Sequence, residues 1–68
     1  MRTFTDDNTN GYTQQELDTA NRLYRIRMRD AAIEMCGSDS DIEYFESEWK
    51  SLSDQIMEQI LTEIDSHR

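Results

Sequence analysis

The chain has 68 residues, with 15 acidic and seven basic side chains and a formal net charge of −8 at neutral pH. A chain of this length forms one domain at most, and its negative charge disfavours nucleic acid and anionic membrane as binding partners. No apolar run approaches the roughly 20 residues that span a bilayer, and no signal-peptide core follows Met1, so we expect a cytoplasmic protein.

Side chains that could carry chemistry are few. The single cysteine, Cys36, excludes an internal disulfide, and Cys36 with the only histidine, His67, makes too few soft ligands for a zinc site. No histidine stands near Cys36 in the sequence to activate it as a nucleophile. We therefore expect a non-enzymatic protein that holds no metal and no cofactor.

Residues 1–12 are polar and rich in turn-forming side chains, which is typical of a flexible arm, and Phe4 or Tyr12 could pin this arm to the helices. Within this arm Asp6-x-Asn8-x-Asn10-Gly11 matches the first six positions of an EF-hand calcium loop. The bidentate glutamate expected at the twelfth position is missing, since Leu17 stands there. A polar turn is therefore favoured over a calcium site, although the sequence leaves both open.

A first helix is predicted over residues 14–36. Thr13-Gln14-Gln15-Glu16 has the pattern of a capping box, and Gly37 supplies the left-handed residue that commonly ends a helix. Apolar residues at helical spacing mark one face of this helix. From this face we assign three residues to the core: Leu17, Tyr24 and Met28.

A second helix is predicted over residues 41–66, beginning at the capping box Ser40-Asp41-Ile42-Glu43. Apolar side chains recur along it every three or four positions and form one stripe. From this stripe we assign five residues to the core: Phe45, Trp49, Leu52, Ile56 and Ile60. The short connection between the helices forces them to run antiparallel. The predicted fold class is all-α, with residues 13–68 forming an antiparallel two-helix hairpin.

The back of the first helix carries an unusual group of residues, which we call the arginine–isoleucine surface: Arg22, Arg25, Ile26, Arg29 and Ile33. A hairpin has no internal reason to place two isoleucines there, so this surface indicates self-association or a partner. Single exposed aliphatic residues are nevertheless common on small proteins. Because two helices alone leave part of their apolar stripe wet, we expect a homodimer that forms a four-helix bundle.

The second half of the chain is strongly acidic, with nine acidic residues and only Lys50 as a base between positions 39 and 65. Four carboxylates on outward positions form what we call the acidic surface: Glu43, Asp54, Glu58 and Asp65. Such an array can attract a basic protein surface and imitate the phosphates that the surface normally binds. A solvated face that serves only solubility is the alternative.

The pattern Tyr12-Thr13-x-x-x-Leu17-x-x-x-Asn21, followed by an amphipathic hairpin, resembles small acidic proteins encoded by bacteriophages and other mobile elements. Some of those proteins inhibit host defence systems, and anti-CRISPR proteins are among them. The resemblance implies a protein-binding inhibitor and transfers no functional residue to this chain.

The sequence therefore favours a protein–protein interaction module. In the first hypothesis it is a small acidic phage or mobile-element inhibitor that binds a basic surface of a host defence or nucleic-acid-handling complex. The alternative is a structural or regulatory homodimer, such as a phage particle component or an antitoxin-like partner. The acidic surface would carry the first function and the arginine–isoleucine surface the second, while direct nucleic-acid binding is disfavoured because the chain as a whole is negatively charged.

Overall fold

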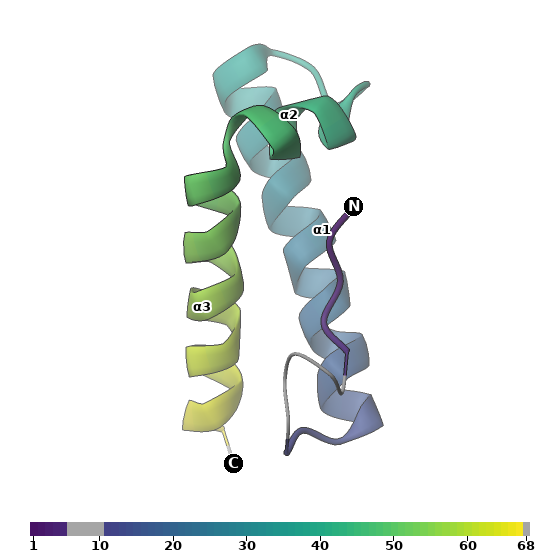
Figure 1. Ribbon diagram of the computed structural model, residues 1–68, viewed down its shortest axis with the longest axis vertical. Coiled ribbons are helices and arrows are strands. Elements are labelled where there is room, and N and C mark those ends of the chain that lie inside the picture. The colour runs from purple at the N-terminus through teal and green to yellow at the C-terminus, as the bar shows by residue number, and fades with distance from the viewer. Residues whose placement is uncertain (6–10, 68) are drawn as a thin grey trace.

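A computed structural model describes residues 1–5 and 11–67 (Figure 1). This part of the chain is all-helical and contains no strand, which confirms the all-α part of the predicted fold class. The helices are α1 (Gln14–Cys36), α2 (Ile42–Glu48) and α3 (Lys50–Ser66). Helices α1 and α3 lie side by side and antiparallel, and α2 crosses the end of the molecule at which they are joined. None of the described helices is long and apolar enough to cross a membrane.

The two ends of α1 form as predicted. The Glu16 backbone N–H donates to Thr13 Oγ1 at 3.1 Å, and the Thr13 N–H donates to Glu16 Oε1 at 2.9 Å, which completes the capping box. At the other end, Gly37 takes φ of 78° and its N–H donates to the Ile33 carbonyl. Local sequence signals therefore set both boundaries of this helix.

The prediction of one continuous helix over residues 41–66 is wrong, because the backbone bends at Trp49. This residue has φ of −111° and ψ of 50°, so that it ends α2 and precedes α3. The helix start is also displaced by one residue: Asp41 caps α2 by accepting from the Tyr44 N–H at 3.1 Å. Hydrogen bonds continue through the bend, and α2 contacts both α1 and α3. The apolar spacing is uninterrupted there, which is why the sequence carries no sign of the bend.

The core lies between α1 and the inner faces of α2 and α3. Six of the predicted core residues are buried, and Leu52 is half-buried at its edge. The buried side chains are Phe4, Leu17, Ala20, Tyr24, Met28, Ala32, Phe45, Ser53, Ile56 and Ile60. The buried residues of α1 include two alanines, while α3 contributes the larger Ile56 and Ile60.

Trp49 does not belong to this core, contrary to the sequence prediction. Its side chain is 44% exposed, and its ring stacks on that of Phe45 with centroids 6.1 Å apart. The bend explains the difference, because a residue with non-helical torsions leaves the stripe that its spacing assigns to it. Phe45, by contrast, is only 3% exposed.

Residues 1–5 pack on the hairpin, and Phe4 is the residue that pins this part of the N-terminal arm. Phe4 is 3% exposed and meets the ring of Tyr24 edge-on, with centroids 6.2 Å apart. Its N–H donates to Asn21 Oδ1 at 2.6 Å, and Asn21 Nδ2 donates to its carbonyl at 3.2 Å. The calcium-loop pattern falls mainly on residues 6–10, which lie outside the described residues.

The different burial of the two stacked rings makes a test of the bend. Phe45→Ala should lower the free energy of unfolding by about 3 to 5 kcal/mol, because it empties a buried position. Trp49→Ala should cost only about 1 to 2 kcal/mol, since much of the indole already contacts water. Urea denaturation followed by circular dichroism measures both values. Equal losses for the two variants would contradict the exposed position of Trp49.

Candidate protein-binding surface

Residues 1–5, which we call the N-terminal strap, are held against the hairpin by a group of hydrogen-bonded side chains. We call this group the polar cluster, and its members are Arg2, Tyr24, Glu46, Ser53 and Asp54. The guanidinium of Arg2 donates through Nη1 to Ser53 Oγ at 3.1 Å and also contacts Asp54 Oδ1. The Arg2 backbone N–H donates to Glu46 Oε2 at 3.0 Å. One strap residue thus contacts α2 through its main chain and α3 through its side chain.

Tyr24 is the member of the polar cluster that lies on α1. Its hydroxyl donates to Glu46 Oε2 and lies 2.6 Å from Ser53 Oγ. Because the single phenolic proton goes to Glu46, Ser53 donates to Tyr24, while Arg2 donates to Ser53. Tyr24 and Ser53 are almost fully buried, and every buried side-chain nitrogen and oxygen in the described residues has a partner.

The hydrogen bonds of the polar cluster hold the strap and the three helices together. Burial and the hydrogen bond to Glu46 raise the pKa of Tyr24 to about 12, although the hydrogen bond from Ser53 lowers it in part. The phenol is therefore neutral at physiological pH and donates a hydrogen bond to Glu46. Among the residues that the structure describes, no three His, Cys, Asp or Glu side chains are placed to hold a metal ion.

The acidic surface predicted from the sequence is divided by contacts with the first part of the chain. The N-terminal amino group lies 3.5 Å from Glu43 Oε1, and Asp54 is paired with Arg2. The Tyr12 hydroxyl donates to Asp65 Oδ1 at 2.8 Å. Glu58 is the member of this surface whose carboxylate makes neither a hydrogen bond nor an ion pair with another described residue, and it is exposed.

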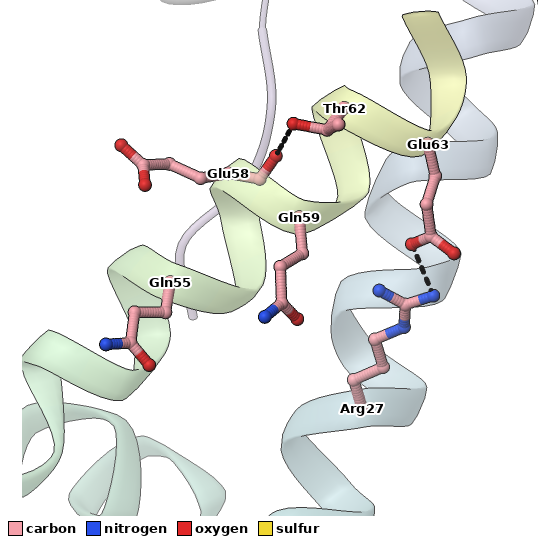
Figure 2. A pocket seen from close by; sticks show the side chains of 6 residues that line it. All are labelled: Arg27, Gln55, Glu58, Gln59, Thr62 and Glu63. Carbon is pink, nitrogen blue, oxygen red and sulfur yellow. Dashed lines mark hydrogen bonds and ion pairs between the residues drawn. The ribbon is translucent and has the colours of Figure 1, made fainter. Parts of the chain in front are cut away.

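A shallow groove runs along the seam between α1 and α3 next to Glu58 (Figure 2). Its charged feature is the pair between Arg27 of α1 and Glu63 of α3, 2.6 Å apart. The remaining lining comes from α3: Gln55, Glu58, Gln59 and Thr62. In Figure 2 the carboxylate of Glu58 extends away from the Arg27–Glu63 pair. Glu58 is therefore presented outward and not toward α1.

The arginine–isoleucine surface is exposed on the outer side of α1. Ile26 and Ile33 are 45% and 46% exposed, and the three arginines of this surface are also exposed. Arg25, Ile26 and Arg29 line one hollow together with Met1 of the strap. Arg29 Nε lies 3.9 Å from Asp39 Oδ2, at the limit of an ion pair. The structure therefore brings most of this surface together beside the strap.

Three residues of the polar cluster were missed in the sequence, namely Arg2, Glu46 and Ser53. Ser53 carried a usable signal, because it stands four residues after Trp49 and seven before Ile60, within the apolar stripe. A polar side chain at such a position needs a buried partner. Arg2 and Glu46 carried no comparable signal, since a charged residue in a polar N-terminal segment or beside an apolar stripe is expected to lie on the solvent-exposed surface.

Comparisons with known protein families, with curated proteins and with solved structures find no match to this chain. The assignment of function therefore depends on the geometry and charges described above.

The raised pKa of Tyr24 predicts a loss of stability at high pH. The pKa is 10.0 in the unfolded reference and about 12 in the folded chain, so the unfolded state loses this proton first. The stabilisation is fully present below pH 10 and is lost as the pH rises toward 12. Urea denaturation over this range should show a falling free energy of unfolding, and Tyr24→Phe should remove much of the fall.

Tyr44→Phe is the matched control, because Tyr44 is 63% exposed. This variant should keep the Tyr24 contribution to the pH dependence. Identical pH profiles for the wild type and Tyr24→Phe would contradict the buried, hydrogen-bonded state of the Tyr24 phenol.

Proposed function

We propose that this protein is a non-enzymatic protein-binding module that docks the acidic surface against a basic surface of another protein. The observation that carries the proposal is the separation of charge in the fold. Between positions 39 and 65 the chain has nine acidic residues and one basic residue, and most of these acidic side chains are exposed. Four of the seven basic residues lie instead on α1.

The rigidity of α3 supports this proposal. A helix holds its carboxylates at fixed spacing, so that a partner binds them without ordering a flexible chain. Complementary charge also accelerates encounter with a basic partner and disfavours acidic ones. Small size, strong negative charge and the resemblance to mobile-element proteins support a more specific form of the proposal. In that form the chain inhibits a host defence or nucleic-acid-handling complex by covering its basic surface.

A second candidate function is that of a regulatory or structural homodimer. The observation that favours it is the exposure of Ile26 and Ile33 on one side of α1, where they would gain stability from cover by a second copy. A dimer of this kind would build a four-helix bundle from two hairpins. The arginines beside these isoleucines would then lie near carboxylates of the second copy.

Charge reversal at Glu58 tests the first candidate, because this carboxylate is exposed and takes no part in the polar cluster. Immobilised wild-type protein should retain a nucleic-acid-handling complex from an extract of its host, and Glu58→Lys should weaken binding to that purified complex about tenfold or more. Glu34→Lys makes the same change in net charge on α1 and should have a much smaller effect. Retention of no such complex by the wild type would refute the proposal.

Asp54→Lys is unsuitable for this purpose, since Asp54 also pairs with Arg2 and its loss would disturb the strap. Binding should weaken as salt concentration rises, because exposed charges are screened. Equal losses for Glu58→Lys and Glu34→Lys would show that net charge alone, and not the acidic surface, governs binding.

Light scattering over a dilution series tests the second candidate. The wild type should show twice the 8.1 kDa mass of one chain, and Ile26→Gln with Ile33→Gln should return it to the single-chain mass. Met35→Gln is the matched control, because Met35 is similarly exposed, at 48%, but lies outside the arginine–isoleucine surface. A single-chain mass for the wild type at all concentrations would exclude self-association as its function.

A further inference from the structure

The N-terminal strap occupies part of the acidic surface in the manner of a bound peptide. Its main chain is held at two points: the Arg2 N–H donates to Glu46 at 3.0 Å, and Asn21 makes hydrogen bonds to both the N–H and the carbonyl of Phe4. Such main-chain bonds do not depend on the side chains of the segment that is bound. The hairpin can therefore hold an extended segment in this position whatever its source.

Two side chains of the strap add selectivity. The Arg2 guanidinium donates to Ser53 Oγ and contacts Asp54 Oδ1, both through Nη1, so the site holds the end of a long cationic side chain between a hydroxyl and a carboxylate. Two residues later, the ring of Phe4 is 3% exposed and packs edge-on against Tyr24. In an extended segment, residues two apart point to the same side. The hairpin thus selects an arginine followed, after one residue, by an aromatic.

We propose that Asn21, Tyr24, Glu46, Ser53 and Asp54 form a binding site for an extended Arg-x-aromatic segment of a partner protein, which residues 2–4 occupy as an internal competitor. This inference rests on the proposed function, since Asp54 belongs to the acidic surface, and it specifies the chemistry of the partner. A basic protein that presents such a segment displaces the strap and takes over its hydrogen bonds. The N-terminal strap then regulates access to the acidic surface.

Competition within one chain sets the affinity that a partner needs. Only residues 6–13 separate the strap from α1, and a short linker gives an effective concentration in the millimolar range. The apparent dissociation constant of a partner segment rises in inverse proportion to the fraction of sites that the strap leaves free. Helices α1 and α3 also contact each other directly, and these contacts do not involve the strap.

The experiment uses a fluorescent peptide with the sequence Arg-Thr-Phe-Thr, blocked at both ends, which copies residues 2–5 of this chain. Fluorescence anisotropy measures its binding to the full-length wild type and to Arg2→Ala. Because the competitor is weakened, Arg2→Ala should bind the peptide about tenfold more tightly than the wild type. Adding Asp54→Asn to Arg2→Ala should abolish this gain. Two control peptides, with Ala in place of Arg or Ala in place of Phe, should bind more weakly.

Circular dichroism establishes that each variant is folded, and Phe4→Ala provides a second way to open the site. Equal peptide binding by the wild type and by both opened variants would overturn the proposal, as would failure of folded Arg2→Ala to bind the peptide at millimolar concentration. A further measurement needs no variant. In the wild type, millimolar peptide should weaken the nuclear Overhauser contact between Phe4 and Tyr24 as the peptide concentration rises, and an unchanged contact would also overturn the proposal.

The outcome is distinct from that of the Glu58 experiment, because Glu58 lies outside the Arg-x-aromatic site. If Glu58→Lys loses the partner but the opened variants bind no peptide, the proposed function stands and this inference fails. If the peptide binds as expected but partner binding is insensitive to Glu58→Lys, the site exists and the proposed use of the acidic surface fails.

Discussion

The hydroxyl of Tyr24 is the point on which the rest of the structure depends. It donates to Glu46 of α2 and accepts from Ser53 of α3, and through these two residues it is connected to Arg2 of the strap. The strap and the three helices α1, α2 and α3 therefore meet at one buried polar group. Because a buried polar atom without a partner destabilises a protein by about 1 to 3 kcal/mol, these contacts specify how the segments fit together.

This arrangement links the stability of the fold to the surface that we propose for binding. Asp54 serves the strap on one side and the acidic surface on the other, while Glu58 on the next turn of α3 belongs to the acidic surface alone. The positive charges of the N-terminal amino group and of Arg2 thus pair with carboxylates of the same chain. They reduce the repulsion within a strongly acidic helix, and they leave a smaller outward surface than the sequence alone indicates.

Much of the fold follows from local patterns, and most of the candidate site does not. The capping box at Thr13 and the glycine at position 37 mark the ends of α1 in the sequence. Each signal involves residues only a few positions apart, so it can be recognised without the tertiary structure. The bend at Trp49 has no such local sign, since the apolar period continues through it. The same limit applies to Arg2, whose partners stand more than 40 positions away in the chain.

By itself, the amino-acid sequence determined the all-helical class, the antiparallel hairpin, the two faces of α1 and the acidic character of its second half. These properties depend on helical period, on end signals and on charge, all of which act over short distances along the chain. The tertiary structure alone decided that Phe4 is buried, that Trp49 is exposed, and that three members of the acidic surface contact the first part of the chain. These outcomes required segments far apart in sequence to compete for the same space and the same hydrogen-bond partners, and only the folded chain resolves that competition.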